Sequence, residues 1–60
     1  MTEEARIGDY VLLSYRDPGL PTYTWFWVKE INSNQRVVSP YFNSQKEAMI
    51  WADNKPEWAE

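Results

Sequence analysis

The apolar residues of this chain follow two different periods. Over the first two thirds, short runs rich in Val, Ile, Tyr, Phe and Trp are typical of β-strands. Near the C-terminal end the spacing becomes helical, with Ala48, Met49, Trp51 and Ala52 on one stripe. The pattern therefore predicts three strands and then a helix, at 7–16, 22–31, 36–42 and 44–54.

Turn and cap signals separate these elements. Residues 17–21 (DPGLP) carry two prolines and a glycine, and 32–35 (NSNQ) is a polar stretch between two apolar runs. Ser44 followed by Glu47 is a capping box, and Pro56 ends the helix. The residues outside these elements are expected to be polar tails, 1–6 and 55–60. The chain is predicted to be a single domain, 1–60, without repeats.

The predicted fold class is α+β, a three-stranded antiparallel meander with one C-terminal helix. A turn over 32–35 sets Trp25 opposite Phe42 on one side. On the other side, a register with Trp25 opposite Leu13 also places Lys29 opposite Asp9, which is a favourable charge pair.

The run Trp25-Phe26-Trp27 cannot lie on one face, because successive strand side chains point to opposite faces. One face of the sheet is expected to hold Ile7, Val11, Leu13, Tyr15, Tyr23, Trp25, Trp27, Ile31, Val38 and Phe42. The other is expected to hold Tyr10, Leu12, Phe26, Val28, Val37 and Tyr41. The first face is the expected seat of the helix, although the two could exchange roles. One helix cannot cover both, so the second face is a contact surface, unless coiling of the sheet or the tail with Trp58 hides it.

The candidate site is this second face. Its expected contact centre is Tyr10, Leu12, Phe26, Val28 and Tyr41. Its expected rim is Arg16, Glu30 and Arg36. Aromatic anchors supply buried area with little loss of conformational entropy, which is why they dominate binding hot spots.

Composition narrows the function. The 60 residues include four Trp, four Tyr and two Phe, but no Cys and no His. No nucleophile–base pair, glycine-rich phosphate loop or metal-ligand spacing stands out, so the sequence predicts a non-enzymatic protein without cofactor or metal. The net charge of −3 argues against the basic surface of a nucleic-acid binder. No apolar run is long enough to cross a bilayer, and a soluble, cytoplasmic protein is expected.

Three functions remain open at this level. The first is binding of another protein through the aromatic face, and the second is self-assembly into a homodimer or larger oligomer. The third, ranked last, is binding of single-stranded nucleic acid by stacking on the aromatics.

Two resemblances extend this interpretation. The strand with Gly8, Asp9 and Val11, followed by Trp27 (or Trp25) and Val28, resembles the opening hairpin of SH3-like and Tudor-like barrels. That resemblance implies a small β-barrel as the alternative fold, with an aromatic cage built from Tyr15, Tyr23 and Trp25.

In size, acidity, lack of Cys and layout, the whole chain is similar to the small accessory proteins of tailed bacteriophages. That similarity implies an inhibitor or modulator that binds a host protein in the host cytoplasm.

Overall fold

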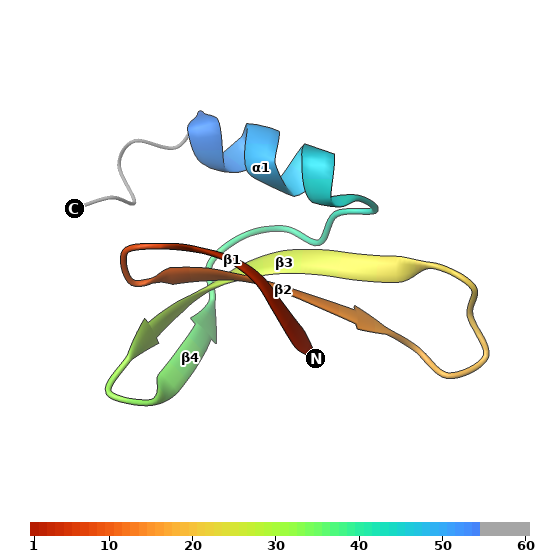
Figure 1. Ribbon diagram of the computed structural model, residues 1–60, viewed down its shortest axis with the longest axis horizontal. Helices are drawn as coiled ribbons and strands as arrows, with labels where there is room; N and C mark the ends of the chain where they lie inside the picture. Colours follow the sequence, from red (N-terminus) through yellow and green to blue (C-terminus); the bar gives the residue numbers. More distant parts are fainter. Residues whose placement is uncertain (55–60) are drawn as a thin grey trace.

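Four antiparallel strands and one helix make up the described part of the chain. The computed structural model describes residues 1–54. Its elements are β1 (Thr2–Ile7), β2 (Tyr10–Arg16), β3 (Tyr23–Ile31), β4 (Asn34–Val37) and α1 (Gln45–Asp53). The strands pair in chain order, and α1 lies over one face of the sheet (Figure 1).

The predicted α+β class with an antiparallel sheet and a C-terminal helix is confirmed, but the sheet has four strands instead of three. The barrel alternative is wrong, because β1 and β4 lie at separate edges of an unclosed sheet. The predicted tail at 55–60, with Trp58, lies outside the described residues.

The additional strand is β1, formed by residues of the stretch expected to be a polar tail, 1–6, together with Ile7. A two-residue turn at Gly8-Asp9 pairs Ile7 with Tyr10 and so divides the stretch that was predicted as one strand. Gly8 has a φ of +59°, the left-handed conformation that glycine adopts without a steric penalty. The strand reads as a tail because an edge strand exposes most of its side chains, and charged residues protect such edges from pairing.

The predicted pairing of β2 with β3 is wrong by one residue. Leu12 lies opposite Trp27 and Leu13 lies opposite Phe26, so every β2 side chain is on the face opposite to the one expected. Val11, Leu12 and Leu13 form a continuous apolar run, and either register buries apolar residues. Hydrophobic patterning therefore does not fix the register of this strand.

The β3–β4 hairpin turns earlier than expected. Asn32 and Ser33 both have positive φ values, 52° and 72°, as a two-residue type I′ turn requires. Ile31 consequently lies opposite Asn34 instead of Arg36. This shift of two residues keeps each side chain on its predicted face.

The predicted pairing returns after an irregular segment. Trp25 and Phe42 form an antiparallel bridge, as the sequence predicts. Between β4 and this bridge, the Ser39 hydroxyl oxygen accepts a hydrogen bond from the Trp27 backbone N–H at 2.8 Å. Pro40, which has no N–H to donate, lies in this irregular segment.

The helix begins where the capping box places it. The Ser44 hydroxyl accepts a hydrogen bond from the Glu47 backbone N–H at 3.2 Å. The face of the sheet beneath α1, here called the helix face, buries Tyr10, Leu12 and Trp27 against Ala48 and Ala52. The aromatic core thus joins β2 and β3 to the helix.

The face away from α1, here called the open face, has its own buried cluster. It consists of Val11, Leu13, Phe26 and Val28, with Tyr15 packed beside it. The sheet coils toward this side, so that the N-terminus and β4 both lie below the centre of the sheet (Figure 1). The coiling foreseen as an alternative therefore hides most of this face, and only part of it remains accessible.

Candidate interaction groove

The predicted contact centre is divided by the structure. Tyr10 and Leu12 are buried under the helix, whereas Phe26 and Val28 are buried in the open-face cluster. Tyr41 alone of these five is exposed, at 66%. The prediction that all five form one accessible surface is wrong, because the register of β2 and the coiling of the sheet were not foreseen.

The predicted rim is also divided. Arg16 and Arg36 belong to the helix face, as the cross-strand pairing with Tyr23 and Lys29 requires. Glu30 lies on the open face, two residues from Val28 along β3, and is half-buried.

A groove remains at one end of the open face. Its volume is about 480 Å³, and it is lined by Met1, Tyr15, Thr24, Phe26, Val37 and Tyr41. Tyr15 belongs to β2, Thr24 and Phe26 belong to β3, and Val37 ends β4, while Met1 precedes β1 and Tyr41 follows β4. The coiled sheet thus brings residues next to both of its edge strands round the same hollow. The sequence places Val37 and Tyr41 on this face correctly. It misses Tyr15 through the register shift, and Met1 because residues 1–6 read as a tail.

The groove has a fixed aromatic floor and an exposed aromatic wall. The rings of Phe26 and Tyr41 lie 5.3 Å apart at an angle of 73°, an edge-to-face contact. Phe26 is buried, whereas Tyr41 and Val37 are exposed at 66% and 46%. Apolar side chains therefore remain accessible on a rigid support, which is how aromatic anchors operate in protein interfaces.

An acidic group stands at the edge of the groove. The pKa of Tyr15 is raised, chiefly because its hydroxyl donates a hydrogen bond to Asp17 and because the carboxylate charge disfavours a phenolate beside it. A smaller electrostatic contribution comes from Tyr41, which lines the same groove. Asp17 is exposed in the loop that follows β2.

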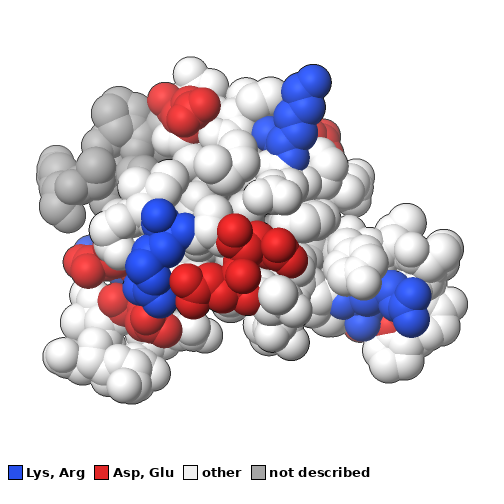
Figure 2. Space-filling view, in the orientation of Figure 1, with Lys and Arg blue, Asp and Glu red and all other residues white. Residues whose placement is uncertain are grey.

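An ionic cluster crosses the rest of the open face. Arg6 of β1 donates to Glu30 of β3 at 2.9 Å and to Glu3 at 3.3 Å, and Gln35 of β4 donates to Glu30 at 3.0 Å. These bonds hold the pKa of Glu30 below its ordinary value and raise the pKa of Arg6. Arg6 lies opposite Val11 of β2. The Arg6–Glu30 bridge therefore passes over β2 and shields the Val11 side chain. Figure 2, viewed with β1 in front, shows basic and acidic side chains side by side at this edge of the sheet.

The strand charges are thus divided unequally between the two faces. On the open face Arg6 is bound by two carboxylates, and a third, Asp17, contacts Tyr15. The remaining basic residues of the strands lie on the helix face, namely Arg16, Lys29 and Arg36. Among the described strand residues, no basic side chain on the open face is without an acidic partner.

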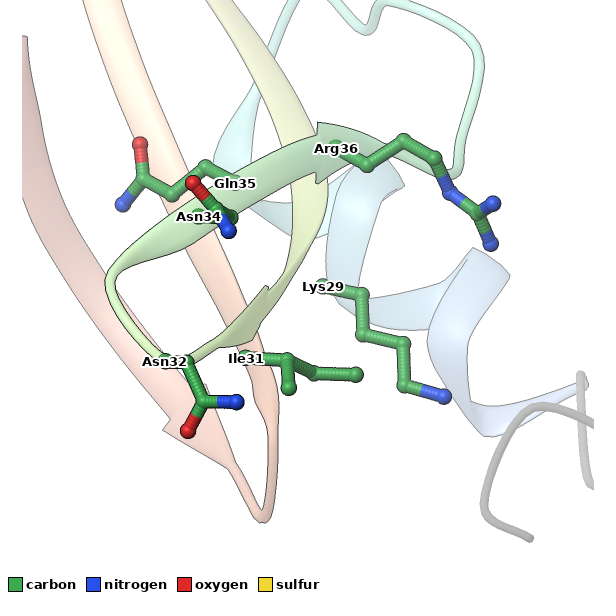
Figure 3. Close-up of a pocket in the computed structure, with 6 residues that line it drawn as sticks. All are labelled: Lys29, Ile31, Asn32, Asn34, Gln35 and Arg36. Carbon is green, nitrogen blue, oxygen red and sulfur yellow. The ribbon is translucent and has the colours of Figure 1, made fainter.

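A second, more polar hollow lies at the β3–β4 hairpin. It has a volume of about 310 Å³ and is lined by Lys29, Ile31, Asn32, Asn34, Gln35 and Arg36. Lys29 and Arg36 are directly opposed, and their side chains extend to the same side of the hairpin in Figure 3. The Lys29 ammonium lies 5.6 Å from the centre of the Tyr10 ring, a cation–π contact.

The described linings of the two hollows contain no cluster of metal-ligating side chains. Within residues 1–54 no group of three His, Cys, Asp or Glu side chains could hold a metal ion. The single described helix is too short and too polar to cross a membrane. The three aromatics of the cage that the barrel resemblance implies are separated, since Tyr15 belongs to the open face and Tyr23 and Trp25 to the helix face.

Comparisons with protein-family models, with curated protein sequences and with solved structures find no match to this chain. The groove must therefore be interpreted from its own geometry and charge.

Proposed function

We propose that this protein is a small non-enzymatic interaction module that binds another protein through the groove on the open face. The observation that carries the proposal is the contact between exposed Tyr41 and buried Phe26 inside an apolar hollow. An aromatic ring held in place by the core loses little conformational entropy when a partner covers it. In the role implied by the similarity to phage accessory proteins, the partner is a host protein whose surface is blocked by occupation.

Self-assembly is the second candidate, since the same face could pair between two copies. Charge disfavours it, because a two-fold contact would bring Glu3, Glu30 and Asp17 of each copy toward the same groups of the other. Sedimentation over a concentration series separates the candidates, and a monomer at every concentration removes self-assembly.

Single-strand binding has the weaker support. Stacking needs accessible ring faces beside basic groups. On the open face the basic strand residue Arg6 is bound to Glu3 and Glu30. The other basic strand residues lie on the helix face, where Trp27 is buried under α1 and Lys29 is engaged with Tyr10. Loss of any nucleic-acid signal in a filter assay at about 150 mM salt removes this function.

The test of groove binding compares two exposed apolar residues. Tyr41→Ala removes the wall of the groove, whereas Ile50→Ala removes another exposed apolar side chain, from the surface of α1, where Ile50 is 51% exposed. A partner captured from cells of the source organism is identified by mass spectrometry, purified and titrated by calorimetry against each variant. We expect Tyr41→Ala to weaken binding at least about tenfold and Ile50→Ala to leave it unchanged.

Thermal melts of both variants accompany the titration, because a loss of folding would mimic a loss of binding. Equal affinity of Tyr41→Ala and the wild-type chain, with both folded, would remove the groove as the binding site.

A further inference from the structure

We propose that the groove receives a basic segment of the partner, with one apolar side chain seated in the hollow and Lys or Arg side chains against the carboxylates around it. This inference rests on the proposed function, since it concerns the chemistry of the segment that binds in the same groove. It commits to a cationic peptide segment in preference to a second copy of the chain or an acidic segment.

The apolar lining of the groove determines which kind of side chain the bound segment places in it. The hollow is lined by phenol, phenyl, thioether, isopropyl and threonine side chains, so that the α-ammonium group of Met1 is the one charged group that its six lining residues carry. Its volume of about 480 Å³ lies within the range of about 300–1,000 Å³ that is common for ligand sites. A large apolar side chain fits this lining, whereas a charged one placed at its floor on Phe26 would lose its hydration without a partner.

The charged residues around the groove determine which sign of charge the bound segment should carry. Asp17 stands beside Tyr15 at one end of the groove, and Glu3 and Glu30 lie further along the same face. Arg6 forms hydrogen bonds with both of these glutamates and so offers an acidic partner little free positive charge. A segment with cationic side chains flanking its apolar anchor therefore meets complementary potential, and an acidic segment meets repulsion.

The helix face differs from the open face in the charge of its strand residues. Arg16, Lys29 and Arg36 all belong to the helix face, where Glu4 is bound to Ser14. The strand charges on that face are therefore positive on balance and would attract an acidic partner there, and a basic one on the groove side. The net charge of −3 acts in the same direction for the whole chain and accelerates encounter with a cationic partner.

The test uses the full chain and a random library of displayed peptides of about 12 residues, a length that spans an extended binding segment. We expect the enriched peptides to combine a large apolar residue with a net positive charge. The tightest of them, made synthetically, is titrated against the wild-type chain and its variants. Tyr41→Ala should abolish binding, and Asp17→Asn should weaken it about two- to fivefold, as loss of one exposed ion pair does.

Asp53→Asn is the matched control, because Asp53 is an exposed aspartate at the end of α1, away from the groove. It should bind like the wild-type chain. Raising the salt from about 50 to about 500 mM should weaken the wild-type complex and have a smaller effect on Asp17→Asn.

Three results would overturn the inference. One of them refutes only the basic occupant, and the other two also refute the proposed function. Enrichment of neutral or acidic peptides that lose binding in Tyr41→Ala keeps the groove as the binding site and refutes the basic occupant. The absence of any enrichment, or binding that Tyr41→Ala leaves intact, refutes both the occupant and the proposed function.

Discussion

Replacement of Trp27 by alanine tests whether one side chain holds the helix to the sheet. Trp27 is fully buried, and its indole Nε1 donates a hydrogen bond to the carbonyl oxygen of Ala48 at 2.9 Å. Removing a large aromatic from a core costs about 3–5 kcal/mol. The stability of a chain of this length is about 3–9 kcal/mol, at about 0.05–0.15 kcal/mol per residue. We therefore expect Trp27→Ala to remove about a third or more of the stability of the domain and to lower its Tm by more than about 10 °C.

Trp27→Phe separates the hydrogen bond from the packing. The phenyl ring retains much of the apolar contact but cannot donate to Ala48, whose carbonyl keeps its place in the helical hydrogen-bond pattern. The lost bond should cost about 0.5–1.5 kcal/mol. At about 4–8 °C per kcal/mol for a small domain, Tm should fall by about 2–12 °C.

The assay is thermal and urea unfolding followed by far-ultraviolet circular dichroism. Phe26→Ala probes the open-face cluster in the same way and should also cost about 3–5 kcal/mol, because Phe26 is buried. Ile50→Ala on the exposed side of α1 is the control and should change stability by less than about 0.5 kcal/mol. Cooperative melting of Trp27→Ala within a few degrees of the wild-type chain would refute this account of the core.

Two further predictions concern β1. Gly8→Ala should lower stability by about 1–2 kcal/mol, since φ at Gly8 is +59° and no atom within 4 Å would obstruct the new methyl group; an equal loss in Gly8→Asn, measured by urea unfolding, would contradict a backbone cause. Glu30 has a lowered pKa when folded, so its contribution to stability is complete above its ordinary value of 4.5 and is lost as the pH falls through the folded value. The fall of Tm over this acid range should be smaller in Glu30→Gln, and an identical pH profile would show that the Arg6 bridge does not stabilise the fold.

Much of the layout could be predicted from local signals. The helix start follows from Ser44 and Glu47, which form the capping box at its N-terminus. This feature depends on neighbouring residues, and short-range chemistry determines it. The Trp25–Phe42 pair also agrees with the prediction, but only because the irregular segment after β4 offsets the earlier turn at Asn32-Ser33.

The register of β2 could not be predicted, because its pattern lacks alternation. The three consecutive apolar residues Val11 to Leu13 can be buried in either register. The Gly8-Asp9 turn and the pairing with β1 determine which register forms. A glycine within a strand-like run was the available signal, since it often marks a turn or bulge. The groove was missed for the same reason, because Tyr15 changes face with the register.

The need to stabilise a very short chain explains why so little of the open face remains accessible. A sheet with one helix would leave its second face wet, but a domain of this size needs the apolar area of both faces to be stable. Coiling buries Phe26 and Val28, and the ionic cluster around Arg6 covers Val11. In the proposed function, the side chains that contact the partner are those that the fold does not require, above all Tyr41, whereas Phe26 at the floor of the groove belongs to the core. Substitutions in the groove should therefore fall into two groups, those at exposed wall positions that change affinity alone and those at the floor that change stability and affinity together.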